Sequence, residues 1–123
     1  MQQPTSIMLA VSEEFSFPLL TELCGKFGYK CHSVRSGREL IDSARRERPD
    51  LIVSSLVMSD IAGSASTEWL KADPATAGIP IILIAGPGRS EERLRGLAAG
   101  ADYLLAEPCT TEQLLDTVHL FIG

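Results

Sequence analysis

Residues 49–63 have the sequence PDLIVSSLVMSDIAG, and this stretch decides the fold that we expect. Its centre, Leu51–Val53, is a short apolar run bounded by polar residues. Such a run is typical of a strand that is buried on both faces, as in a parallel sheet. We therefore predict a strand over residues 51–55, followed by a loop that ends at Gly63.

Comparable segments lie on both sides of this strand. Apolar runs predict the other strands at residues 7–11, 29–34, 81–84 and 102–106. Helical spacing of apolar residues predicts helices at residues 18–27, 36–48, 67–72, 91–99 and 110–122. Because strands and helices alternate, we expect an α/β fold: a doubly wound five-stranded parallel sheet with helices on both faces. No linker or repeat interrupts this pattern, so we expect a single domain over residues 1–123.

Two of the predicted helices begin with a capping box, in which the first side chain and the one three residues later cap each other's backbone amides. Ser36 and Glu39 have this spacing, and so do Thr110 and Gln113.

The charges and cysteines exclude several classes of function. The 123 residues carry 11 basic and 16 acidic side chains, a net charge of −5, so we expect no nucleic-acid partner, which would need clustered cations. No apolar run is long enough for a membrane span, and the N-terminal run is too short for a secretion signal. The three cysteines form no C-x-x-C pair, which indicates reduced thiols and a cytoplasmic location.

Function in a doubly wound sheet gathers at the carboxyl ends of the strands. In this chain we expect that edge to hold residues 12–14, 54–59, 85–88 and 107–109. These segments contain no Gly-rich dinucleotide motif, and the acidic segment after the first strand would repel a flavin phosphate. The edge therefore disfavours a dinucleotide or flavin site.

Three segments resemble the receiver domain of bacterial two-component response regulators: residues 49–63, 73–86 (DPATAGIPIILIAG) and 98–109 (AAGADYLLAEPC). The resemblance extends over the whole chain and implies the flavodoxin-like strand order 2-1-3-4-5. It also implies a cis peptide bond before Pro108. A receiver of this family takes a phosphoryl group from a histidine kinase onto an Asp that ends the third strand.

The residues that carry receiver chemistry differ in this chain. Ser55 stands at the position of the phosphoacceptor Asp, and Ala85 at that of the Thr or Ser that binds the phosphoryl group. Glu107 replaces the Lys, and Leu104 stands at the aromatic switch position, with Tyr103 facing the other way. Phosphoryl transfer depends on positive charge placed around the moving group. These replacements therefore predict a pseudo-receiver, which is not phosphorylated and is not an enzyme.

An acidic segment follows the first strand, where the resemblance implies a pair of carboxylates that holds Mg²⁺. Ser12, Glu13 and Glu14 form the candidate acidic pocket. Because Ser55 replaces the ligand Asp, we expect no metal and no cofactor. The open alternative is a cation such as Mg²⁺ held by Glu13, Glu14 and Glu107.

A pseudo-receiver would act by contact with a partner protein in bacterial signalling. The resemblance implies a contact face made by the fourth helix, the fifth strand and the fifth helix. The candidate residues, all expected to be exposed, are Arg93, Arg95, Tyr103, Glu112 and His119. The loop over residues 57–63 is a second candidate surface. The alternative function is an atypical receiver that is phosphorylated at Asp60 or regulated by a cation at the acidic edge.

Overall fold

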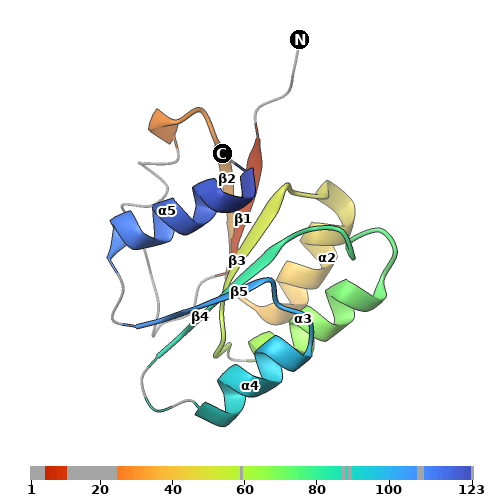
Figure 1. Cartoon of the computed structure of the whole chain (residues 1–123). Helices are drawn as coiled ribbons and strands as arrows, with labels where there is room; N and C mark the ends of the chain where they lie inside the picture. The colour runs from red at the N-terminus through yellow and green to blue at the C-terminus, as the bar shows by residue number, and fades with distance from the viewer. Residues whose placement is uncertain are drawn as a thin grey trace.

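One five-stranded parallel sheet organises the molecule, as a computed structural model shows; it describes residues 5–10, 25–58, 60–86, 88, 90–107 and 110–122. The strands are β1 (Ser6–Ala10), β2 (Lys30–Val34), β3 (Leu51–Ser55), β4 (Ile81–Ala85) and β5 (Tyr103–Ala106). The helices are α2 (Gly37–Glu47), α3 (Gly63–Ala72), α4 (Ser90–Ala98) and α5 (Thr111–Ile122). The strand order is β2-β1-β3-β4-β5, which confirms the predicted fold (Figure 1).

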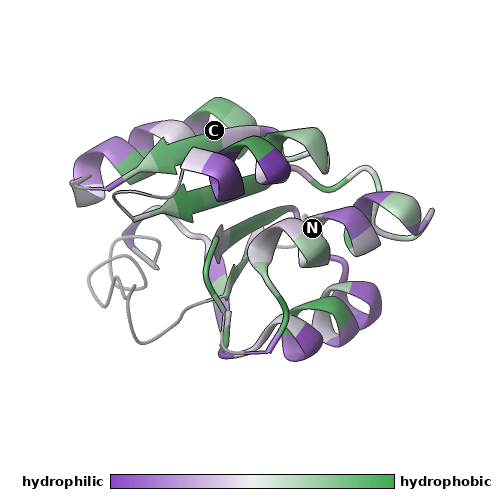
Figure 2. Cartoon of the chain, turned by 90° about the horizontal axis from the view of Figure 1, so that it is seen from below, coloured by the Kyte–Doolittle hydropathy of each residue, from purple (hydrophilic) through white to green (hydrophobic). Residues whose placement is uncertain are grey.

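The described helices lie on both faces of the sheet. Helices α2, α3 and α4 lie on one face and α5 on the other (Figure 1). Along β1, Met8 and Ala10 pack into the cluster with α2 and α3, whereas Ile7 and Leu9 pack into the cluster with α5. Because both faces are covered, the inner strands β1, β3 and β4 are buried along almost their whole length, and most of their residues are hydrophobic (Figure 2). Each fully buried Ile or Leu contributes about 1.5–3 kcal/mol to this core.

Side-chain caps start α2 and α5 as predicted. The Glu39 amide donates to Ser36 Oγ at 3.0 Å. At α5 the pairing is reciprocal: the Gln113 amide donates to Thr110 Oγ1 at 3.0 Å, and the Thr110 amide donates to Gln113 Oε1 at 2.8 Å. Each cap satisfies helix amides that have no partner within the helix.

Helix α3 begins at Gly63, four residues before the predicted start at Thr67. Its N-cap, Ala62, makes no side-chain cap bond, so the sequence carries no start signal there. The helix predicted over residues 18–27 lies mostly outside the described residues. Within the described part of the chain, no helix is both long and apolar enough to cross a membrane.

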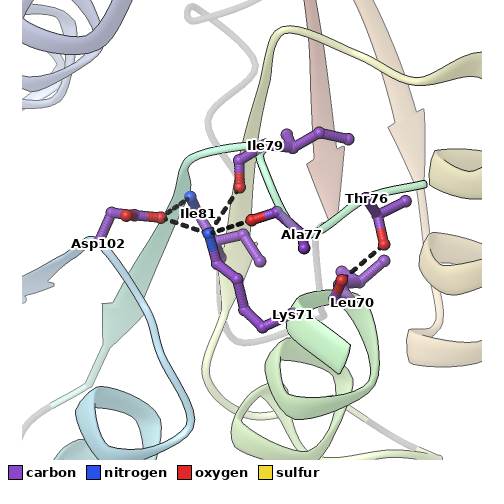
Figure 3. Close-up of polar contacts among 7 residues, drawn as sticks. All are labelled: Leu70, Lys71, Thr76, Ala77, Ile79, Ile81 and Asp102. Carbon is purple, nitrogen blue, oxygen red and sulfur yellow. Dashed lines mark hydrogen bonds and ion pairs between the residues drawn. The ribbon is translucent and has the colours of Figure 1, made fainter. Parts of the chain in front are cut away.

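Lys71, at the end of α3, joins three segments at the amino edge of the sheet (Figure 3). Its Nζ donates to the carbonyl oxygens of Ile79 and Ala77, at 2.9 and 3.4 Å, and forms an ion pair with Asp102 Oδ2 at 2.9 Å. Asp102 Oδ2 also accepts a hydrogen bond from the Ile81 amide at 2.8 Å. The pair therefore ties α3 to the beginnings of β4 and β5.

Candidate functional site

Ser55 is the last residue of β3, at the carboxyl edge of the sheet. The strand runs between β1 and β4, and the Ser55 side chain is buried. Its hydroxyl donates to the Val57 carbonyl oxygen at 3.0 Å and accepts from the Val57 amide at 3.3 Å. The hydroxyl thus shapes the first turn of the loop that follows β3.

Ala85 ends the neighbouring strand, β4, and is fully buried. Its carbonyl oxygen accepts a hydrogen bond from the Glu107 amide at 2.7 Å, which brings the residue after β5 alongside the end of β4. The methyl side chain offers no hydroxyl to a ligand at this edge. The structure therefore places Ala85 and Glu107 side by side, as the resemblance implied.

Glu107 brings a negative charge to the same edge. A Cβ atom at Gly86 would lie 3.7 Å from Glu107 Oε2, so the carboxylate lies against the backbone that follows β4. The side chain is half-buried, and it makes no hydrogen bond or ion pair with the residues that the structure describes. An anion entering between the ends of β4 and β5 would meet this carboxylate and be repelled.

Arg93 is less exposed than predicted, and its place on a contact face stays a prediction. Its side chain is half-buried, and its Nη2 donates to the Gly86 carbonyl oxygen at 3.0 Å. Its Nε is buried and has no partner among the described residues. Since the helix after β4 begins at the carboxyl edge, residues in its first turns lie near that edge. That rule would have placed Arg93 near this edge, where its guanidinium brings a positive charge.

Asp60 lies in the loop after β3, and both of its carboxylate oxygens are engaged. Oδ1 accepts from the Gly37 amide at 2.8 Å, and Oδ2 accepts from the Arg38 amide at 3.1 Å. These are the first two amides of α2. The Gly37 hydrogen bond is the main reason that the pKa of Asp60 lies below its usual value of 3.8, and the Arg38 bond acts in the same direction. Asp60 thus serves as a second cap of α2, contributed by a distant loop.

The contribution of Asp60 to stability should disappear in acid. Because its folded pKa is lowered, this contribution is complete above the unfolded pKa of about 3.9 and is lost as the pH falls through the folded value. Asp60→Asn is therefore expected to melt below wild type at pH about 6, with the two Tm values converging as the pH falls below about 4. Thermal denaturation over this range checks the prediction. A difference that stays constant into acid would contradict it.

Leu104 and Tyr103 point to opposite faces of β5, as predicted. Leu104 is half-buried and packs against the cluster under α2, α3 and α4. Tyr103 is 40% exposed, and its ring meets that of Phe121 edge-on, with a centroid distance of 6.4 Å. The aromatic side chain of β5 therefore belongs to the α5 side of the sheet.

The predicted contact face is more apolar than the sequence suggested. Arg95 and Glu112 are exposed there, as expected. Large apolar side chains that are also exposed on α4, β5 and α5 are Leu94, Leu97, Tyr103 and Leu120. Leu120 is 75% exposed and borders a groove between β5 and α5. Leu120 was not among the predicted contact residues, because helical spacing places it on the polar side of α5.

His119 was also expected to be exposed on this face, and that prediction is wrong. It is half-buried, and its ring meets the ring of Phe27 edge-on, with a centroid distance of 4.8 Å. The Tyr29 ring lies at 5.9 Å. Its Nε2 is buried without a hydrogen bond to any described residue. His119 thus packs toward the segment that leads into β2, away from β5.

Four residues of the predicted site lie outside the described residues: Ser12, Glu13, Glu14 and Pro108. The acidic pocket and the cis peptide bond stay predictions. Of the described side chains at this edge, Ser55 bonds to the Val57 backbone, Ala85 has no ligand atom and Asp60 caps α2, which leaves the Glu107 carboxylate as the described candidate for a cation ligand. The cation site that would join it to Glu13 and Glu14 stays a prediction. The described part of the chain holds no group of three or more His, Cys, Asp or Glu side chains suited to a metal.

The sheet order and the polar edge define the class of protein, a flavodoxin-like α/β domain with its site at the strand carboxyl ends. The family model of the response regulator receiver domain matches residues 8–119, and the chain belongs to that family. It is 30% identical over 122 residues to the polar-differentiation response regulator DivK of Brucella anthropi, covering 98% of each chain. Receiver domains are in general signalling modules of two-component systems and not enzymes.

Solved structures agree with this assignment. The receiver domain of sensor histidine kinase PA1611 from Pseudomonas aeruginosa PAO1, which holds a magnesium ion in its active site cleft, matches with a TM-score of 0.86, 23% identity and 98% coverage of both chains. The signal receiver domain of a histidine kinase from Syntrophus aciditrophicus matches with a TM-score of 0.82 and 30% identity, over 96% of this chain and 89% of that one.

Proposed function

We propose that this chain is a pseudo-receiver, a receiver domain that signals by protein contact without phosphorylation. The observation that carries the proposal is the carboxylate of Glu107 beside the end of β4, next to Ala85, which has no hydroxyl. A receiver needs cations and donors around the moving phosphoryl group. In this chain the Glu107 carboxylate would repel a phosphoryl group, and Ala85 provides no ligand for it.

Arg93, a cation near this edge, does not replace the missing lysine. Arg93 donates to the carbonyl oxygen of Gly86, which holds its guanidinium at the backbone. The proposal therefore rests on the charge at Glu107 and on the groups absent at Ser55 and Ala85, and not on a general lack of cations.

The alternative acceptor, Asp60, is disfavoured by its contacts. Each Asp60 oxygen accepts an amide hydrogen bond of α2, which stabilises the carboxylate and makes it a weaker nucleophile. Phosphorylation of one oxygen would weaken the hydrogen bond that it accepts and so weaken the cap of α2.

The contact surface that fits this function is the one formed by α4, β5 and α5. Its exposed side chains Leu94, Leu97 and Leu120 supply apolar area, and Arg95 and Glu112 lie among the exposed polar residues. Tyr103 and Leu120 line one groove between β5 and α5, and exposed apolar side chains at such a groove are typical of protein interaction sites. We propose a cytoplasmic signalling protein as the partner.

Restoring the acceptor alone should not restore phosphorylation. Ser55→Asp is expected to stay almost unlabelled by acetyl phosphate and Mg²⁺, because Glu107 still repels the phosphoryl group. Adding Glu107→Lys should raise the labelling rate at least about tenfold, since replacing a negative by a positive charge at this edge lowers the barrier by more than about 1.4 kcal/mol. Intact-protein mass spectrometry over time measures both rates.

The matched control is Glu68→Lys in the Ser55→Asp background, which makes the same charge change at an exposed position on α3. It should leave labelling unchanged. If Ser55→Asp alone were labelled as fast as the variant with Glu107→Lys, Glu107 would not be the obstacle and the proposal would lose its basis.

A further inference from the structure

The loop between β3 and α3 is joined to the first turn of α2 by the carboxylate of Asp60. We propose that this contact is a clamp that holds the loop in one conformation in the absence of any phosphoryl group. The inference rests on the proposed function in one respect: a module that is not phosphorylated needs another way to order the surface it presents. The clamp itself depends only on contacts within the chain.

The clamp and Ser36 together satisfy the first three amides of α2. The amides of Gly37 and Arg38 donate to Asp60, and the amide of Glu39 donates to Ser36 Oγ. Without Asp60, two of these amides would lose their partner, because the first amides of a helix have none within it. The negative carboxylate also lies at the positive end of the helix dipole. The loop therefore accepts two of these three amide hydrogen bonds.

Close packing reinforces the hydrogen bonds. A Cβ atom at Gly37 would lie 2.8 Å from both Ile61 Cβ and Ser66 Oγ, so α2 touches the loop and α3 as closely as a glycine allows. Ser66 is buried, and its hydroxyl has no hydrogen-bond partner among the described residues. Gly37, Ile61 and Ser66 are therefore held together by close packing and not by a hydrogen bond of the Ser66 hydroxyl. A small movement of the loop would separate them.

The two ends of the loop are also held. At its start, the Ser55 hydroxyl bonds to Val57, and at its end the Gly63 amide donates to the Leu56 carbonyl oxygen at 2.8 Å. Asp60 fixes the middle. Among the described residues, hydrogen bonds thus attach the loop near Val57, Asp60 and Gly63, and those of Asp60 reach α2. A partner that displaced Asp60 would release the loop and the first turn of α2 together.

Amide hydrogen exchange by NMR tests the clamp on the whole chain, with no phosphodonor and no partner present. The deciding amides are those of Gly63 and Ser66, which bond to Leu56 and Ala62 and not to Asp60. In Asp60→Ala their exchange should rise about five- to thirty-fold, the factor expected for the loss of a one- to two-kilocalorie cap. The amides of α5 should not change. Asp60→Asn keeps one acceptor oxygen, so the exchange rates of these amides should lie between those of wild type and Asp60→Ala.

The matched control is Asp42→Ala, which removes an exposed carboxylate from the middle of α2 and should leave the Gly63 and Ser66 amides unchanged. The clamp would be ruled out if these amides exchanged at the wild-type rate in Asp60→Ala. A rise of the same size in Asp42→Ala, or one shared by α5, would also rule it out. Since no phosphoryl group is involved, this result is independent of whether the pseudo-receiver assignment holds.

Discussion

Replacing Lys71 by methionine is expected to lower the free energy of unfolding by about 2–3 kcal/mol. The substitution keeps much of the apolar stem and removes the charge. It leaves the carbonyl oxygens of Ala77 and Ile79 without their donor and Asp102 without its cation. The expected loss lies below the roughly 3–5 kcal/mol of a fully buried pair, because the Lys71 and Asp102 side chains are 20% and 36% exposed.

Urea denaturation followed by circular dichroism measures this loss. Lys26→Met makes the same chemical change at an exposed lysine and should shift the midpoint little. A Lys71→Met variant as stable as wild type would show that the contacts in Figure 3 carry no net stability.

Adding one methyl group at Gly63 is expected to destabilise the fold by roughly 1–3 kcal/mol. The Cβ of Gly63→Ala would lie 2.7 Å from the Ser55 carbonyl oxygen and 2.8 Å from Leu56 Cα. Both are backbone atoms of β3 and its extension, so neither can turn aside as a side chain would. Alanine favours a helix more than glycine does, so helix propensity alone predicts that Gly63→Ala stabilises the fold. The steric clash is expected to outweigh that gain and lower the free energy of unfolding.

Gly78→Ala is the control, since a Cβ there would have nothing within 4 Å. It should be neutral or slightly stabilising in the same thermal and urea measurements. A Gly63→Ala variant more stable than wild type would mean that the end of β3 and the start of α3 separate more easily than the contacts indicate.

The fold could be predicted from the sequence because its signals are local. The bounds of β3 were predicted correctly, since Leu51–Val53 is apolar on both faces and Pro49 precedes it. The caps at Ser36 and Thr110 were visible as spacing in the chain. The start of α3 was missed because Ala62 has no capping side chain.

The candidate site was predicted only in part, because several of its contacts join distant segments. The strand-end rule placed Ser55, Ala85 and Glu107 at one edge, and the structure confirms that Ala85 and Glu107 adjoin. The reach of Asp60 to α2 spans 23 residues and has no signature in the sequence. Burial of His119 depends on Phe27, on another segment, and could not be seen from the spacing along α5.

The most direct test of the pseudo-receiver assignment is the intact mass of the wild-type chain after incubation with acetyl phosphate and Mg²⁺. A receiver domain with Asp at the end of its third strand, treated in the same tube, confirms that the donor is active. We predict no gain of a phosphoryl group on this chain. A gain that disappears in Asp60→Asn or in Ser55→Ala would contradict the account and identify the residue that accepts the phosphoryl group.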